Sequence, residues 1–219
     1  MNPIGIFGGT FDPIHFGHLR TAFELLHFLG LAEMRFVPAG EPPHRDRPRA
    51  EAAVRLRLVR AAVDDQAGFV VDDREVRRGG PSYSVLTLAE LRGEMPGRSL
   101  CLSVGMDAFL GLPQWYRWRE ILDLAHIVVA HRPGWRAPQE GVLGELLRTR
   151  GTDRVADLHE AQAGRIFVQP VTQLEIASTE LRNLLAAGVD PRYLVPDEVR
   201  RLILETGSYR RPTTMSPTR

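Results

Sequence analysis

Two histidines three residues apart, His15 and His18, lie in the segment GGTFDPIHFGH at 8–18, which holds the densest group of chemically useful residues in the chain. A glycine between them removes side-chain bulk, so both imidazoles can converge on one small volume if a helix begins near residue 16. Gly8 and Gly9 let the backbone approach a ligand, and the unpaired N–H groups of a helix start favour an anion. The segment therefore predicts a phosphate cradle.

This cradle differs from the common nucleotide-binding loops. Its glycines are not spaced as G-x-G-x-x-G, and no Gly-Lys-Ser follows, so a dinucleotide fingerprint and a Walker loop are both excluded. All 28 basic residues are arginine, which excludes a catalytic lysine. A metal site or a polar turn would also account for a histidine pair. Zinc is disfavoured because no third ligand lies nearby in sequence, while a distant ligand stays open.

Two further segments carry polar residues at the start of a predicted helix or the end of a predicted strand. Ser178 and Thr179 begin a helix, where a hydroxyl either caps the helix or faces a phosphate, and Arg182 follows one turn later. In EPPHR at 41–45, two prolines stiffen a loop that holds His44 and Arg45 outward. A solvated loop is the alternative there.

The elements that position these residues follow from hydrophobic periodicity. The pattern predicts strands at 4–8, 34–40, 69–73, 99–105, 125–133 and 165–169, and helices at 18–29, 52–63, 84–94, 117–123, 178–187 and 196–206. Near-continuous apolar strands alternating with helices are typical of a doubly wound parallel α/β sheet. A helical excursion is expected over about 134–164, within one domain at 1–209 that is followed by a flexible tail at 210–219.

Composition sets further limits. With 219 residues, 43% hydrophobic and 25% charged, the chain is typical of a globular protein, and its apolar runs are too short for a membrane helix. The net charge of +1 predicts no general attraction to nucleic acid or membranes. Cys101 is the sole cysteine, so no internal disulfide can form, and we expect it in the core. With no signal peptide recognised, we expect a cytoplasmic protein.

The segment at 8–18 closely resembles the G-x-F-D-P-x-H-x-G-H motif of the HxGH nucleotidyltransferases, and IASTELR at 176–182 resembles their I-S-S-T-x-x-R. The intervening PPHR, PSYS, VGMD, QWY and HRP occur in the order found in the bacterial nicotinate-nucleotide adenylyltransferase family of NAD biosynthesis. This resemblance covers about residues 3–209 and implies a Rossmann-like sheet with C-terminal helices. Arg45 departs from the lysine of many members but preserves the charge.

The resemblance implies transfer of AMP from ATP to nicotinate mononucleotide, giving deamido-NAD and pyrophosphate, with Mg²⁺ carried mainly by ATP. It implies catalytic roles for His15, His18 and Arg182. The implied ATP-binding residues are Gly8, Gly9, Thr10, Phe11, His15, His18, Gly105, Asp107, Arg132, Ser178, Thr179 and Arg182. The implied residues for the mononucleotide are His44, Arg45, Ser84, Trp115 and Tyr116.

Within this resemblance, Trp115 offers a face on which the cationic nicotinate ring can stack. Backbone N–H groups near Ser84 and Tyr116, each expected at a helix start, could receive its carboxylate. A structural aromatic cluster of Trp115, Tyr116 and Trp118 is the alternative, as is a simple turn at Asp107. Two rival functions are another HxGH enzyme, such as phosphopantetheine adenylyltransferase, and a non-catalytic nucleotide-binding regulatory protein.

Overall fold

The computed structural model describes residues 1–43, 47–131, 138–172 and 174–210. Within these ranges, seven parallel strands form one sheet in the order β3-β2-β1-β4-β5-β7-β6. In chain order they are β1 (Ile4–Gly9), β2 (Glu33–Pro38), β3 (Phe69–Val71), β4 (Leu100–Gly105), β5 (His126–His131), β6 (Gly151–Thr152) and β7 (Ile166–Pro170). The predicted parallel α/β sheet is confirmed.

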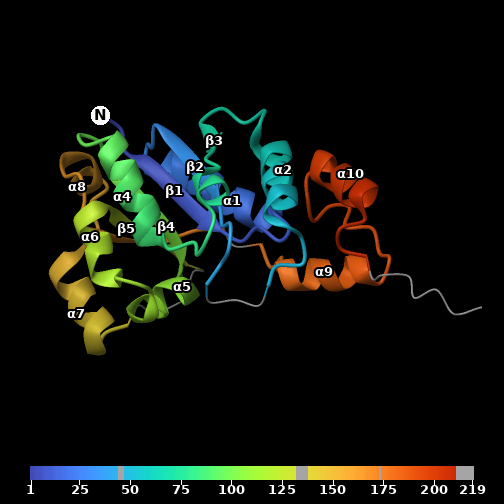
Figure 1. Cartoon of the computed structure of the whole chain (residues 1–219). Coiled ribbons are helices and arrows are strands. Elements are labelled where there is room, and N and C mark those ends of the chain that lie inside the picture. Colours follow the sequence, from blue (N-terminus) through green and yellow to red (C-terminus); the bar gives the residue numbers. More distant parts are fainter. Residues whose placement is uncertain (44–46, 132–137, 173, 211–219) are drawn as a thin grey trace, which may run out of the picture.

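Helices cover both faces of this sheet (Figure 1). They are α1 (Phe16–Phe28), α2 (Ala52–Val63), α3 (Arg74–Arg78), α4 (Ser84–Glu94), α5 (Met106–Leu110), α6 (Ile121–Leu124), α7 (Gly141–Arg150), α8 (Ala156–Glu160), α9 (Ser178–Ala186) and α10 (Asp197–Thr206). Two short 3₁₀ helices, η1 (Leu112–Gln114) and η2 (Trp118–Glu120), lie between α5 and α6. In Figure 1, α9 and α10 lie at one end of the molecule near α2, whereas α7 and α8 lie at the opposite end.

The core consists of two apolar clusters separated by the sheet. Because successive strand residues point to opposite faces, Ile6 and Leu102 pack with α4 and α6, while Phe36 and Cys101 pack with α1, α2, α9 and α10. Cys101 is buried, as predicted, and burial raises the pKa of its thiol to about 12. The doubly wound arrangement thus follows from apolar residues on both sides of each central strand.

The order of the strands reverses between β1 and β4, which are neighbours in the sheet but far apart in the chain. From β1 the chain winds outward through β2 to β3, then crosses to β4 and winds the other way. Ligands of open parallel sheets bind beyond the carboxyl ends of the strands at such a point. Gly9 and Gly105 end the two strands, so the segments that follow them flank the expected binding crevice.

Several short elements were not predicted. Helices α3, α5 and α8 have five residues each, and β6 has two residues that pair with β7 at the sheet edge. Elements this short carry too few periodic positions to be recognised in sequence. The described part of the expected excursion contains α7 and α8, with β6 between them. No helix among the described residues is long and apolar enough to cross a membrane.

Candidate active site

The two histidines of the first turn lie against each other at the start of α1. His15 precedes the helix and His18 lies in its first turn, and their rings stack with centroids 3.7 Å apart. The predicted convergence of the two imidazoles is therefore confirmed. An added Cβ on Gly17 would lie 2.9 Å from Nδ1 of His15, so the ring occupies space that only glycine leaves open.

His15 is buried and has an unpartnered ring nitrogen among the described residues. It is only 5% exposed, and no described residue accepts or donates a hydrogen bond at its Nδ1. His126, in contrast, is bonded at both ring nitrogens, to the Ala161 carbonyl and the Arg165 amide, each at 3.0 Å. Burial lowers the pKa of His15 from 6.5 to about 4, so its ring is neutral at pH 7.

Two aromatic rings pack against the ring of His18. The edges of Phe7 and Phe11 meet its ring at centroid distances of 6.3 and 5.2 Å. Phe11 is 2% exposed and belongs to the core, so its ring does not face a ligand. The ring of Phe11 thus packs against His18 from the core, and the expected contact of Phe11 with ATP stays a prediction.

The C-terminal motif packs directly onto this turn. Nη1 of Arg182 donates to the carbonyl of Asp12 at 2.8 Å and lies 3.7 Å from its carboxylate. Ser178 donates through its hydroxyl to the Pro13 carbonyl at 3.0 Å, and Thr179 Oγ1 accepts from Nη2 of Arg182, also at 3.0 Å. Ala177 is the N-cap residue of α9, and its helix start has no side-chain capping bond among the described residues. The capping alternative for Ser178 and Thr179 is therefore wrong.

Asp12 connects three segments, and sequence reasoning did not single it out. Its buried carboxylate accepts hydrogen bonds from the backbone amides of Arg49 and Ala50 at 2.9 and 3.1 Å, and it also faces Arg182. The turn after β1, the entry to α2 and the start of α9 are thus fixed to one another. The signal in the sequence was its position inside the motif at 8–18, between the glycines and the first histidine.

A cavity of about 320 Å³ opens on the other side of the crevice. Pro42 and Pro43, which follow β2, and Asp107, which follows β4, both contribute to its walls. Since β1 lies between β2 and β4, this cavity flanks the turn that carries the histidines. Its remaining lining residues are Ser82, Tyr83, Ser84, Ala108, Gly111, Gln114, Trp115 and Tyr116.

The cavity brings together the predicted residues Ser84, Trp115 and Tyr116. Trp115 is partly buried against the core, while Tyr116 is 48% exposed and lies 4.6 Å from the ring of Tyr83, centroid to centroid. Tyr83 was missed, although PSYS pointed to its neighbourhood. Ser84 starts α4 as expected, but Tyr116 lies between η1 and η2 rather than at a helix start. Asp107 lines this cavity from the first turn of α5.

Comparison with known proteins identifies the family. The cytidylyltransferase-like family model matches residues 6–184. A protein of Aeromonas hydrophila named "Probable nicotinate-nucleotide adenylyltransferase" is 50% identical, covering 95% of this chain and 97% of the relative. A protein of Halorhodospira halophila with the same name is also 50% identical, covering 97% of each chain. The chain belongs to the nicotinate-nucleotide adenylyltransferase family. It is therefore an enzyme of the nucleotidyltransferase class.

A solved structure shows the same fold. The Plasmodium falciparum nicotinic acid mononucleotide adenylyltransferase complexed with NaAD aligns with a TM-score of 0.72 at 14% identity, covering 95% of this chain and 98% of that one. The Rossmann-like architecture of the family is thus present here. The two curated relatives carry the name of a nicotinate-nucleotide adenylyltransferase and not that of a phosphopantetheine adenylyltransferase.

Three residues implied by the family resemblance, His44, Arg45 and Arg132, lie outside the described residues. Gly8 and Gly9 end β1, and the carbonyl of Thr10 accepts a hydrogen bond from Arg55 at 2.7 Å. Gly105 precedes α5 at the end of β4. All four therefore lie at the crevice of this nucleotidyltransferase fold.

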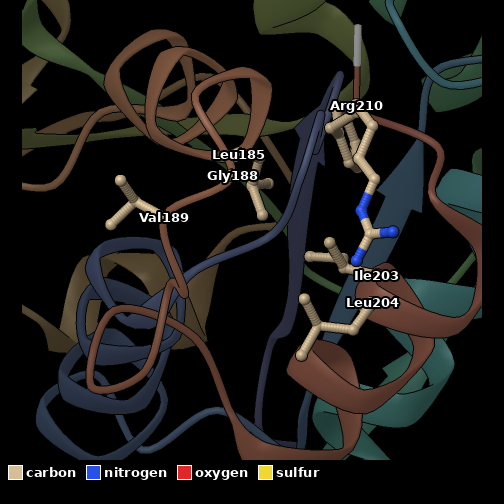
Figure 2. Close-up of a pocket in the computed structure, with 7 residues that line it drawn as sticks. Leu185, Gly188, Val189, Ile203, Leu204 and Arg210 are labelled. Carbon is tan, nitrogen blue, oxygen red and sulfur yellow. The ribbon is translucent and has the colours of Figure 1, made fainter. Parts of the chain in front are cut away.

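A second, smaller cavity of about 90 Å³ lies between α9 and the end of α10. Figure 2 shows Leu185, Gly188 and Val189 on one side, with Ile203, Leu204 and Arg210 on the other. Its lining is mostly apolar and includes none of the residues implied for the family's substrates. Among the described residues, no group of three or more His, Cys, Asp or Glu could hold a metal ion.

Proposed function

We propose that the chain joins AMP from ATP to nicotinate mononucleotide, giving deamido-NAD and pyrophosphate. One observation supports the proposal: the stacked His15–His18 pair follows β1, and the walls of the cavity of about 320 Å³ come partly from segments that follow β2 and β4, the strands on either side of β1. One half can hold a triphosphate and the other a flat ring. A two-substrate transfer needs both halves next to each other.

In the proposed reaction, a phosphate oxygen of the mononucleotide attacks the α-phosphorus of ATP. A bond forms between this oxygen and the phosphorus, the bond to the bridging oxygen of the β-phosphate breaks, and pyrophosphate leaves with that electron pair. The attacking phosphate is already a nucleophile, so no catalytic base is required. The protein aligns the groups and stabilises the charge that develops.

Each residue of the first half has a role that fits its environment. His15 is neutral at pH 7, so it contributes an N–H donor rather than a full charge. His18 acts beside it, with its ring stacked on that of His15. Arg182 supplies a permanent positive charge and a planar fork for a phosphate. Gly8, Gly9 and Thr10 provide close backbone approach, and Ser178 and Thr179 hold Arg182 and the turn in place.

The second half fits the mononucleotide. The aromatic faces of Trp115, Tyr83 and Tyr116 suit a cationic ring, and one such contact contributes about 0.5–2 kcal/mol. Backbone amides at the start of α4, near Ser84, can receive the carboxylate of nicotinate. The NH₂ group of nicotinamide would face these donors, so the acid is the expected substrate. By family resemblance, His44 and Arg45 also contact the acceptor side, Arg132 flanks the adenine, and Gly105 and Asp107 meet a ribose.

We treat Mg²⁺ as part of the ATP substrate. Asp12, the acidic residue of the histidine turn, already accepts two backbone amides and faces Arg182, so its carboxylate is engaged by the protein. Bound to the phosphate oxygens, Mg²⁺ neutralises part of their charge. We place the reaction in the cytoplasm, where ATP is abundant and a free thiol such as Cys101 stays reduced.

Pyrophosphate release tests the function. The purified chain is incubated with Mg-ATP and, in separate reactions, with nicotinate mononucleotide, nicotinamide mononucleotide or phosphopantetheine. A His18→Ala preparation, purified identically, controls for contaminating adenylyltransferases. We expect rapid release with nicotinate mononucleotide, slower release with the amide and none with phosphopantetheine. Release with phosphopantetheine alone, or no release with any acceptor, would contradict the proposed function.

A further inference from the structure

Arg55 is one of the largest fully buried side chains of the described structure, and the proposed chemistry does not use it. It lies in the first turn of α2 and is 1% exposed. A buried guanidinium is costly unless its donors are satisfied. The hydrogen bonds of the Arg55 guanidinium therefore indicate its role.

The three guanidinium nitrogens each donate to a different backbone carbonyl. Nη1 reaches Thr10 at 2.7 Å, Nη2 reaches Gly40 at 3.0 Å, and Nε reaches Ala50 at 3.1 Å. Thr10 belongs to the histidine turn, Gly40 follows β2, and Ala50 leads into α2. One side chain thus joins the phosphate half of the site to both ends of the loop that faces it.

The Gly40 contact continues to the wall of the acceptor cavity. The Gly40 amide donates to Oγ of Ser82 at 2.9 Å, and the Ser82 amide donates to the Glu41 carbonyl at 2.8 Å. Ser82, Pro42 and Pro43 all line the cavity. A displacement at Gly40 would therefore be transmitted to the acceptor.

Charge and shape together explain why arginine occupies this position. Burial lowers the pKa of the Arg55 guanidinium, and the nearby Asp12 carboxylate opposes that shift. A lysine would lose its charge more readily on burial and would place one nitrogen where arginine places three. Only the planar fork reaches all three carbonyls at once.

We propose that Arg55 is a positioning residue that fixes the distance between the triphosphate turn and the acceptor cavity. This inference rests on the proposed function. Each substrate keeps its own contacts when Arg55 is changed, so binding of either one alone should alter little. Attack of the acceptor phosphate on the α-phosphorus depends steeply on their approach, and a misplacement of about 1 Å can cost about 100-fold in rate.

The test compares Arg55→Lys with Val59→Ala, a buried position one turn further along α2 whose apolar side chain belongs to the core. Both are assayed well below their own unfolding midpoints, with ATP and nicotinate mononucleotide varied in turn. We expect kcat of Arg55→Lys to fall about 10- to 100-fold, with both KM values within about 3-fold of the parent. Val59→Ala should keep the parent kcat.

Gly40→Ala provides a second route if Arg55→Lys does not fold. A Cβ there would lie 2.5 Å from the Glu75 carbonyl oxygen, so the Gly40 backbone must shift away from Glu75, and its carbonyl, which accepts from Arg55, moves with it. The same fall in kcat with little change in KM is expected. A kcat equal to that of Val59→Ala in a folded Arg55→Lys or Gly40→Ala overturns the positioning role. An inactive parent enzyme would instead contradict the proposed function.

Discussion

The two halves of the crevice are built differently. Around the histidine turn, Asp12, Arg55 and Arg182 are tied by hydrogen bonds to segments that are far apart in the chain. The lining of the acceptor cavity includes two prolines, two tyrosines and a tryptophan, and Tyr116 is about half exposed. One half is a buried polar network, and the other is an open aromatic pocket.

This difference matches two physical tasks. Developing charge is stabilised by donors that are fixed before the reaction, because donors that must reorganise contribute less. A flat cationic ring is recognised by aromatic faces, which need no such network and tolerate small shifts. Changes in the first half should therefore act mainly on turnover or on the affinity for ATP, and changes in the second half mainly on the affinity for the acceptor.

The largest expected effect is at His18. Replacing it by alanine removes a donor needed as charge develops, and we expect kcat to fall about 100- to 1000-fold with little change in folding. His27→Ala, on the exposed side of the same helix, is the matched control and should keep full activity. Steady-state kinetics measure kcat, and thermal unfolding shows whether each variant is folded. Turnover of folded His18→Ala within a few-fold of the parent would show that this role is wrong.

Gly17→Ala should have the next largest effect on kcat. Its Cβ would press on the His15 ring at 2.9 Å from Nδ1, so the stacked pair must shift and kcat should fall at least about 10-fold. Gly93→Ala adds the same methyl group in α4, where nothing lies within 4 Å, and should leave kcat unchanged. Equal activity of the two variants would mean that the placement of the ring does not matter.

Arg182→Lys keeps the charge but loses the planar fork that contacts Asp12 and Thr179. We expect KM for ATP to rise about 10-fold and to rise more than KM for the mononucleotide. Arg200→Lys serves as the control, because Arg200 lies on α10 and pairs with Asp190. The reverse ranking of the two KM values would assign Arg182 to the acceptor half.

Trp115→Ala tests the other half. The loss of an aromatic face should raise KM for nicotinate and nicotinamide mononucleotides alike by about 2- to 30-fold, and Trp115→Phe should recover part of it. The preference for the acid should persist, since backbone amides remain. Trp118→Phe, outside the cavity lining, is the control. Unchanged acceptor affinity in Trp115→Ala would leave Trp115 as part of a structural cluster.

We expect the burial of His15 to make the stability of the fold depend modestly on pH. The folded His15 pKa of about 4 is below the unfolded value of 6.5, so the unfolded state binds more protons and stability falls as pH drops below 6.5. Between pH 7.5 and 5.5, His15 should contribute a loss of about 1 kcal/mol in the free energy of unfolding. Urea titrations of His15→Asn should show a smaller loss than the parent. In Trp115→Phe, the free energy of unfolding should depend on pH as it does in the parent. The same pH dependence in His15→Asn would show that His15 does not cause the loss.

Long periodic elements were predictable from sequence, and short ones were not. The helices Ala52–Val63 and Ser84–Glu94 have the predicted limits because their apolar positions recur over three turns. Helix α3 has no such repeat. Its Arg74 is instead held by Asp72 and Glu94, and Glu94 lies at the end of another helix. Such an element depends on tertiary contacts that no local pattern contains.

The candidate site divides in the same way. The spacing of His15 and His18 predicted their convergence because three residues make nearly one helical turn. The hydrogen bonds of Arg55 to Thr10 and of Arg182 to Asp12 join distant segments, and nothing near either arginine in sequence indicates its partner. Tyr83 became visible as a cavity residue only when the segments after β2 and β4 were placed together.

A structure of the chain with a non-hydrolysable ATP analogue and nicotinate mononucleotide tests the central claim most directly. We expect the phosphate chain to lie at the turn after β1, with nitrogen atoms of His15, His18 and Arg182 about 2.7–3.2 Å from its oxygens. The nicotinate ring should lie against Trp115. A phosphate chain bound away from the histidines, or a mononucleotide outside the cavity that contains Trp115, would contradict the division into a charge-stabilising half and an aromatic half.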